Sequence, residues 1–339
     1  MQKTFERIRH FSACSVTADY ISKFIDFYES INYNREQEKP VSSGYDKSVY
    51  LIGSSISSLK PFLLENNIPS NGVFIVQPAI RTQQLKNLYR DDEYFSEWAS
   101  FFIALGTLTN YDKLDRIVFD IYKYLLAIGM NDSDILIRVS SDDDDLVNSC
   151  SKVIPRVKTE VNTRPNHYYK HQYGMDIYGI GGRNMDIALK DYRTKEYADT
   201  GTVVVIEKNG EPIAVEATFG LSAIIARLFG CRHTVQATPV SDFWECADYD
   251  SCRFADCISV VTHLEFEGIY PNSTKMPGRL LKKYIQGVIW YTKKFGIELS
   301  HVMNVFNDYY NAQYKPFGNT NDVLDNIEKH IKKVASNKP

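Results

Sequence analysis

The dipeptide Asn209-Gly210 is the feature that most constrains the fold, because it separates two runs rich in apolar and β-branched residues. Asn-Gly is the favoured two-residue turn of a β-hairpin, in which both central residues adopt a positive φ. The sequence therefore predicts two antiparallel strands, Thr202–Ile206 and Pro212–Thr218. The second strand is expected to lead directly into an apolar helix, Leu221–Phe229.

The first hundred residues predict one amphipathic helix and two strands. Thr17–Glu29 has apolar side chains at helical spacing, with Thr17 as the expected N-cap. Asn32–Asp46 is mostly polar and is expected to form a loop. Strands are predicted at Ser48–Ile52 and at Gly72–Arg81, of which the second is rich in Val and Ile.

The middle of the chain continues this mixture. Leu114–Leu125 has the spacing of a helix with one buried face, and Ile135–Val139 is a strand candidate. The acidic run Asp142–Asp145 suits the first turn of a helix, where the helix dipole is positive; a metal site is the alternative. From Gly230 onward the pattern is mainly helical.

These elements predict an α+β fold, in which an antiparallel sheet flanked by helices is followed by a helical domain. We place the two domains at residues 1–238 and 239–339. The chain contains no G-x-x-x-x-G-K-[ST] motif and no G-x-G-x-x-G motif after a strand. The sequence therefore does not support a P-loop or a Rossmann dinucleotide site.

The composition is that of an ordinary globular protein. Of 339 residues, 44% are apolar and 24% are charged, which argues against a disordered or fibrous chain. No run approaches the roughly 20 apolar residues that span a bilayer, and no apolar signal region follows the charged N-terminus. The six cysteines lack a framework spacing, so we expect reduced thiols and a cytoplasmic location.

Charge is distributed unevenly along the chain. The net charge is −3, but residues 270–339 contain 11 Lys and Arg against 5 Asp and Glu. A local excess of positive charge is typical of a module that faces RNA. A solvated basic surface explains the charge equally well.

The order of several motifs resembles alanyl-tRNA synthetase, a class II aminoacyl-tRNA synthetase. Val76–Arg81 is similar to the S-Q-P-C-I-R strand of motif two, and Phe101–Thr109 is similar to F-F-E-M-L-G-N-F-S. Val215–Leu221 is similar to V-D-T-G-M-G-L, which begins motif three. Further matches in the same order lie at Tyr50–Ile56, Ile137–Asp144, Gly181–Lys190 and Asp256–Tyr284. The resemblance implies a class II catalytic core and tRNA-recognition helices, without the family's editing and C-terminal domains.

The resemblance also implies ATP and Mg²⁺ as cofactors. Arg81 falls where the family holds the α-phosphate, and a guanidinium binds phosphate with two parallel hydrogen bonds. Lys86 and Arg90 fall in the motif-two loop, which reaches over the nucleotide and the tRNA acceptor end. Phe102 and Asp186 complete the implied ATP site, and Asp186 supplies a carboxylate for magnesium or for the substrate.

Two departures from the family concern ATP. The glutamate of F-F-E-M is Ile103, and the motif-three arginine that would hold the γ-phosphate is Ala223. Arg227 lies one helical turn further on, about 6 Å away, so it cannot simply take that place. Arg183 is a candidate replacement from another strand, and weak or absent ATP binding is the alternative.

The implied amino-acid pocket consists of Glu216, Thr218 and Gly220. Glu216 replaces the aspartate that holds the substrate ammonium, and Thr218 replaces a glycine. A carboxylate for the ammonium is therefore kept, while a pocket sized for alanine is altered. The pattern supports an amino-acid substrate more strongly than it supports alanine.

The implied tRNA-binding residues lie near the C-terminal end of the resemblance. Asn272 or Ser273 falls about where the family reads the acceptor stem, and both stay candidates because the alignment slips by about two residues. A helix predicted over residues 278–295 buries one face and carries a basic stripe suited to phosphates. The basic residues are Arg279, Lys282, Lys283, Lys293 and Lys294.

No further metal centre is expected. Cys246, Cys252, Cys257 and His263 have spacings that match no common zinc site. The leading hypothesis is an enzyme that forms an aminoacyl-adenylate and transfers the acyl group to tRNA, in a specialised role such as a biosynthetic pathway. The alternatives are a catalytically impaired paralogue that binds tRNA or a partner, and an amino-acid ligase with another acceptor. We expect no membrane association and leave a homo-oligomer open.

Overall fold

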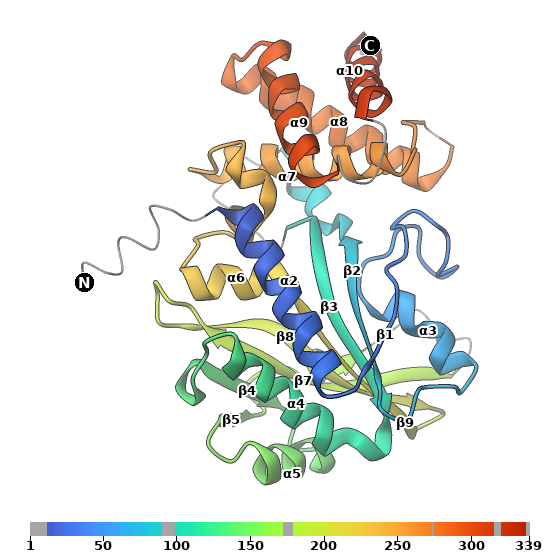
Figure 1. Ribbon diagram of the computed structural model, residues 1–339, viewed down its shortest axis with the longest axis vertical. Coiled ribbons are helices and arrows are strands. Elements are labelled where there is room, and N and C mark those ends of the chain that lie inside the picture. Colours follow the sequence, from blue (N-terminus) through green and yellow to red (C-terminus); the bar gives the residue numbers. More distant parts are fainter. Residues whose placement is uncertain (1–11, 90–98, 172–178, 273, 315–319, 337–339) are drawn as a thin grey trace.

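The structure is a computed structural model, which describes residues 12–89, 99–171, 179–272, 274–314 and 320–336 (Figure 1). A twisted sheet forms the body of the molecule, and a bundle of helices from the C-terminal third lies across one end of it (Figure 1). This is the predicted α+β arrangement. No helix in the described ranges has the length and hydropathy needed to cross a bilayer.

The strands of the described residues are β1 (Asn34–Arg35), β2 (Val73–Ile80), β3 (Phe101–Asn110), β4 (Ile135–Val139), β5 (Lys158–Val161), β6 (Lys170–His171), β7 (Ile180–Lys190), β8 (Tyr197–Lys208) and β9 (Glu211–Gly220). The α-helices are α2 (Ala13–Ser30), α3 (Ile56–Leu64), α4 (Leu114–Ala127), α5 (Asp144–Val153), α6 (Leu221–Phe229), α7 (Tyr249–Phe266), α8 (Met276–Phe295), α9 (Leu299–Gln313) and α10 (Thr320–Ser336).

The strands join in the order β1-β2-β3-β9-β8-β7-β4-β5, and β6 pairs with β7. The central pairs are antiparallel, whereas β1 with β2 and β4 with β5 are parallel. The predicted hairpin is confirmed as β8 and β9. Its turn residues Asn209 and Gly210 have φ values of 54° and 87°, as the Asn-Gly turn requires.

Opposite faces of the sheet are covered by different helices. Helices α2, α4, α5 and α6 form the larger core with one face, where Phe74 and Val203 are fully buried. Helix α3 packs on the other face, where Leu59 meets Ile75 and Val204. Side chains alternate between faces along each strand, so this division decides which residues can share a site.

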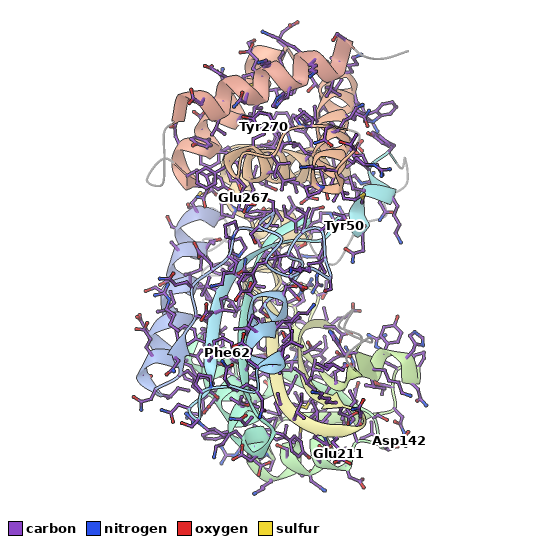
Figure 2. The ribbon with its side chains drawn as sticks, turned by 90° about the vertical axis from the view of Figure 1, so that its right-hand side faces the viewer. Tyr50, Phe62, Asp142, Glu211, Glu267 and Tyr270 are labelled. Atoms are coloured by element: carbon purple, nitrogen blue, oxygen red, sulfur yellow. The ribbon has the colours of Figure 1, made fainter. Side chains whose placement is uncertain are left out.

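The C-terminal helices have a hydrophobic core of their own, built from α7, α8, α9 and α10. Ile80 is the last residue of β2, and Leu88 follows the 3-10 turn after it. Both side chains belong to this core and so connect it to the sheet. Glu267 lies at the junction (Figure 2), where its carboxylate accepts hydrogen bonds from the N–H groups of Val41 at 2.6 Å and Ser42 at 2.7 Å. The domain boundary at residues 238 and 239 stays a prediction.

Two local predictions are wrong. Helix α2 begins four residues before Thr17, because the Ser12 hydroxyl accepts a hydrogen bond from Ser15 N–H and caps the helix. The segment Ser48–Ile52 is not a strand. The hydroxyl and N–H of Ser48 donate to Asp46. At the other end, Ile52 O accepts from Ile80 N–H at 2.8 Å and Ile52 N–H donates to Val41 O at 2.9 Å, which does not make a strand ladder.

Candidate active site

An open cavity of about 230 Å³ lies on the sheet face that α3 covers, next to the ends of β2, β3 and β9. It is lined by five of the residues that the sequence nominates: Arg81, Phe102, Asp186, Thr218 and Gly220. Arg81 directly follows β2, and the other four residues lie on β3, β7 and β9. Their convergence gives the nominated residues a common site.

Arg81 is held at the mouth of β2 by backbone and ring contacts. Its Nε donates to Gly53 O at 3.0 Å, and its guanidinium lies 5.2 Å from the centroid of the Phe102 ring. Burial lowers the pKa of Arg81, and the charge of Glu216 partly offsets this effect. A guanidinium stays charged at neutral pH even so, because its usual pKa is above 12. Arg81 therefore presents a fixed positive charge to the cavity.

Two carboxylates, Asp186 on β7 and Asp199 on β8, line the opposite wall. Asp186 accepts a hydrogen bond from Asn184 Nδ2 at 3.0 Å, and Asp199 is paired with Arg138 and, at 3.3 Å, with Arg164. Burial, followed by the charge of Asp199, raises the pKa of Asp186 to about 7. A cation between the two groups would relieve this repulsion.

The two carboxylates of this wall are ligands of the kind that Mg²⁺ prefers. Mg²⁺ is usually held by one or two carboxylates together with substrate phosphates and water. In the described ranges, no three His, Cys, Asp or Glu side chains gather closely enough to hold a metal. Asp186 and Asp199 would therefore hold Mg²⁺ only together with a phosphate ligand.

Glu216 is placed differently from its neighbours on β9. It is 1% exposed and does not line the cavity, whereas Thr218 does. Ser55, just before α3, lies over both side chains, with its hydroxyl 3.2 Å from Glu216 Oε1 and 2.9 Å from Thr218 Oγ1. The Ser55 hydroxyl can donate to either of these two oxygens. The carboxylate expected to bind an ammonium is thus covered.

The close approach of Ser55 depends on Gly106 in β3. A Cβ on Gly106 would lie 2.2 Å from Ser55 Cβ, so no larger residue fits there without displacing Ser55. A buried ion pair between Lys60 and Asp46, at 2.6 Å, holds the segment that leads to Ser55. No local pattern predicts this cover, because it arises from contacts between segments that are distant in the sequence.

Arg183 lies on the other face of β7 and does not line the cavity. Its Nε donates to Glu207 at 2.7 Å, its Nη2 donates to Asp145 at 2.7 Å, and its Nη1 lies 3.5 Å from Asp143. The hydrogen bond to Asp145 raises the pKa of Arg183 above the usual value of a guanidinium. These partners also account for part of the acidic run, since Asp145 belongs to the first turn of α5 as predicted. The hypothesis that Arg183 replaces the γ-phosphate arginine therefore has no geometric support.

Asp199 on β8 lines the cavity and is a site residue that the sequence did not suggest. His171 on β6 does not line the cavity. Burial and then the positive charge of Arg81 lower the pKa of the His171 imidazole.

The structure also shows where the residues that depart from the family pattern lie. Ala223, on the first turn of α6, lines the cavity, so a longer side chain at this position would reach it. Arg227 does not line the cavity and pairs with Asp191 at 2.9 Å. Ile103 alternates with Phe102 and lines a different cavity on the other sheet face.

The remaining nominated residues lie away from the cavity. Lys86 is exposed on a 3-10 turn, Thr82–Asn87, whereas Arg90 and Ser273 fall outside the described residues. Asn272 has a structural role: its Oδ1 accepts from Lys275 N–H at 2.8 Å and its Nδ2 donates to Tyr270 O at 3.1 Å. This side chain closes the turn that begins α8.

Helix α8 confirms the predicted amphipathic pattern. Leu281, Tyr284, Ile285 and Val288 are buried, and Arg279, Lys283, Trp290 and Lys293 are exposed along one stripe. We call Arg279, Lys283, Trp290 and Lys293 the α8 stripe. Lys282 is partly buried beside it, and Lys294 pairs with Asp250 at 2.7 Å.

An exposed aromatic pair interrupts the positive charge of the α8 stripe. Trp290 is 43% exposed, and its ring meets that of Tyr89, 47% exposed, edge-on at 5.4 Å. Tyr89 follows the 3-10 turn after β2, so this pair links the Arg81 segment to α8. Cations interleaved with exposed aromatic rings are typical of surfaces that bind nucleic acid.

The cysteine-histidine set forms no metal centre in the described part of the chain. Cys252 Sγ lies 3.7 Å from Cys246 O, while His263 instead contacts Tyr314 and Glu267. All six cysteines, which lie within the described residues, are free thiols.

Comparison with known proteins gives one match in sequence. No family model matches the chain. Over 67 residues, 19% of its length, the chain is 37% identical to the alanine–tRNA ligase of Thermofilum pendens. It covers 7% of the length of that curated relative.

Solved aminoacyl-tRNA synthetases are similar to the chain in structure. Histidyl-tRNA synthetase of S. aureus matches at a TM-score of 0.44 and 9% identity, covering 84% of each chain. The RNA-binding domain of threonyl-tRNA synthetase from Cryptosporidium parvum matches at 0.42 and 12%, covering 65% of each. Pyrrolysyl-tRNA synthetase from Desulfitobacterium hafniense matches at 0.40 and 10%, covering 65% of this chain and 72% of that one.

Proposed function

We propose that this chain is a class II synthetase-like ligase that activates an amino acid with ATP and transfers it to tRNA. The observation that carries the proposal is the convergence of Arg81, Phe102 and Asp186 on one cavity. The short sequence match to an alanine–tRNA ligase supports the same reading.

The residues suit the charges of an adenylation reaction. In that reaction a carboxylate oxygen of the amino acid bonds to the α-phosphorus, and the bond to the bridging oxygen of pyrophosphate breaks. Negative charge develops at the α-phosphate, where Arg81 would stabilise it. The Phe102 ring offers an apolar surface beside it, and Mg²⁺ at Asp186 and Asp199 would neutralise phosphate charge.

The amino-acid end of the site differs from the family pattern. Because Glu216 lies under Ser55, the carboxylates that line the cavity and could bind a substrate ammonium are Asp186 and Asp199. Thr218 and Gly220 form the neighbouring floor. This arrangement favours an amino acid other than alanine.

The proposed acceptor is tRNA, bound by the α8 stripe. The hydroxyl at the tRNA 3′ end would attack the acyl carbon of the adenylate and release AMP. The α8 stripe supplies cations for phosphates and the exposed Trp290 ring for a base. Asn272 is left out of this proposal, because its side chain is committed to the turn before α8.

A second candidate, a catalytically impaired paralogue that binds tRNA, is favoured by one specific observation. Ala223 lines the cavity at the place where the family has its γ-phosphate arginine, and neither Arg183 nor Arg227 reaches the cavity. The triphosphate therefore lacks that ligand among the described residues.

ATP–pyrophosphate exchange with each natural amino acid, measured with and without tRNA, separates the two candidates. Exchange stimulated by any amino acid supports the ligase. If no amino acid stimulates exchange while tRNA still binds, the impaired paralogue replaces it. If exchange occurs and tRNA does not bind, the acceptor is another molecule.

A further inference from the structure

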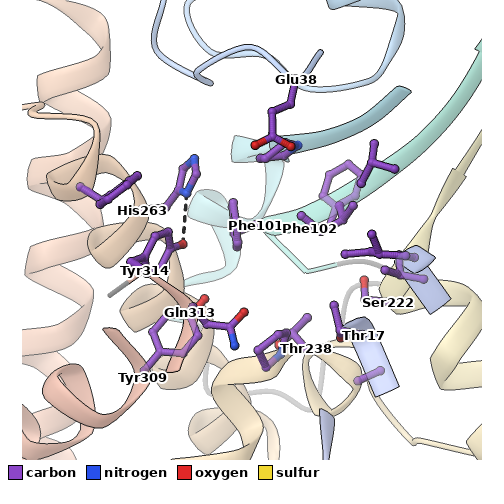
Figure 3. A pocket seen from close by; sticks show the side chains of 18 of the residues that line it. Thr17, Glu38, Phe101, Phe102, Ser222, Thr238, His263, Tyr309, Gln313 and Tyr314 are labelled. Carbon is purple, nitrogen blue, oxygen red and sulfur yellow. Dashed lines mark hydrogen bonds between the residues drawn. The ribbon is translucent and has the colours of Figure 1, made fainter. Parts of the chain in front are cut away.

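A second and larger cavity, of about 370 Å³, lies on the other face of the sheet (Figure 3). Its walls come from α2, β2, β3, α7 and α9, so it sits where the sheet meets the helical bundle. Its volume is in the range of small-molecule sites, which are mostly apolar with a few placed polar groups. Among the described residues that line it, the proposed amino-acid activation uses only Phe102.

The two cavities meet at the end of β9. The β3–β9 pairing ends at Ala104 and Gly220, so the first residues of β3 extend past β9. Phe102 and Ser222 line both cavities at this gap. Ser222 is 6% exposed, and in the described structure its hydroxyl has no hydrogen-bond partner. It is a buried polar group that a ligand in either cavity could reach.

Aromatic rings form much of the wall. Phe101, Tyr309 and Tyr314 surround the space in Figure 3, with His263 packed 4.5 Å from the Phe101 ring. The ring nitrogens of His263 lie close to two neighbouring side chains. Nδ1 lies 3.1 Å from the Tyr314 hydroxyl, and Nε2 lies 3.0 Å from a Glu267 carboxylate oxygen without hydrogen-bond geometry. This wall therefore offers mainly ring surface.

Two charged side chains, Glu38 and Arg35, lie at the opening of this cavity. The Glu38 carboxylate points into the cavity (Figure 3), and in the described residues it has no ion-pair partner. Arg35 also lines the mouth, but its guanidinium lies 3.9 Å from the Glu29 carboxylate. A carboxylate beside aromatic rings favours a cation, which the ring faces also attract.

We propose that this cavity binds a small hydrophobic amine, with its apolar part against Phe101 and Tyr309 and its ammonium group beside Glu38. The site is separate from the one assigned to ATP. Because the two share Phe102 and Ser222, occupancy of one is expected to alter the affinity of the other, and the effect must be reciprocal.

The test uses the full chain and two matched probes, phenethylamine and its neutral analogue phenethyl alcohol, in calorimetric titrations near neutral pH. Phenethylamine should bind with a dissociation constant of about 1 mM or tighter. Glu38→Gln should weaken the amine about 2- to 5-fold and leave the alcohol unchanged, since one partly exposed charge contact is lost. Glu36→Gln is the control, because Glu36 does not line the cavity and pairs with Lys39.

The location is tested on α2. Ile21 lines the cavity and Ile25, one turn later, does not, although both are partly buried. Ile21→Trp should fill the cavity and weaken both probes at least about 10-fold, while Ile25→Trp should not. Two results would overturn the proposal: no saturable binding of phenethylamine, or equal loss in both Trp variants. Binding of the two probes that is equal and unaffected by Glu38→Gln would overturn the assignment to amines.

Discussion

The Ser55 hydroxyl donates a hydrogen bond to Glu216 Oε1 over 3.2 Å and thereby covers the carboxylate that the sequence nominates for a substrate ammonium. The same hydroxyl lies 2.9 Å from Thr218 Oγ1, so Ser55 contacts both β9 side chains. Glu216 is 1% exposed, and its removal from the cavity surface shifts the available negative charge to Asp186 and Asp199. A serine outside the strands therefore decides which carboxylates face the cavity.

Gly106→Ala should displace that serine. The new methyl group would lie 2.2 Å from Ser55 Cβ, and overpacking of this kind costs about 1–3 kcal/mol. We expect urea unfolding to show that loss of stability. Adding Ser55→Gly to Gly106→Ala should restore most of it, because the clashing atoms are gone. A double variant as unstable as the sum of the singles would contradict the packing described.

Arg81→Ala should reduce pyrophosphate exchange by at least about 100-fold, the scale of losing one group that stabilises developing charge. Arg81→Lys keeps a charge but not the planar fork, so it should recover only part of the rate. Thermal unfolding of both variants controls for the lost contact with Gly53. Unchanged exchange in a folded Arg81→Ala protein would remove Arg81 from the reaction.

Asp186 should make stability depend on pH. Burial raises its pKa from 3.8 to about 7, so the folded state binds this proton more tightly than the unfolded state does. The resulting stabilisation is complete below about pH 4 and is lost as the pH rises through about 7, by up to about 4 kcal/mol. The side chain at position 186 cannot titrate in the Asp186→Asn variant. Between pH 5 and pH 8 the free energy of unfolding of this variant, measured by urea unfolding, should therefore fall less than that of the wild-type protein.

Magnesium binding provides a second test of the role of Asp186. If Asp186 and Asp199 hold Mg²⁺ together with ATP, the two ligands added together near pH 8 should stabilise the wild-type protein and have little effect on Asp186→Asn. Equal stabilisation of both proteins would place the metal elsewhere. Parallel pH profiles for the two proteins without ligands would show that Asp186 is not the group that titrates.

Local sequence signals were sufficient for much of the fold. Strand β4 and helix α6 have the predicted bounds, and the Asn-Gly turn specifies the β8–β9 hairpin, because in each case neighbouring residues carry the information. The sequence-based predictions failed where a residue distant in the sequence determines the local structure. Ser12 caps α2 where its hydroxyl also donates to Asp242 at 2.8 Å, and Ser48–Ile52 is held by Asp46 rather than by a neighbouring strand.

The site was predictable only in part, for a related reason. A motif identifies a strand, but the face on which a side chain lies follows from its position in that strand. Arg183 and Asp186 are three positions apart on β7 and therefore lie on opposite faces, so they cannot serve one nucleotide from the same wall. Ser55 reaches Glu216 through a tertiary contact that no local pattern encodes.

The α8 stripe should bind tRNA chiefly through phosphates, and two kinds of variant distinguish charge from stacking. Arg279→Glu with Lys283→Glu should weaken binding across tRNA sequences and flatten the dependence of log affinity on log salt by about two units. Trp290→Ala should weaken binding by about 1–3 kcal/mol if a base stacks on its exposed ring, and leave the salt slope unchanged. Filter-binding titrations over a range of salt concentrations measure both effects. Lys123→Glu, an exposed residue on α4, is the control for a change in net charge far from α8. An unchanged slope in the double variant, or an equal change in the control, would remove the α8 stripe from the tRNA interface.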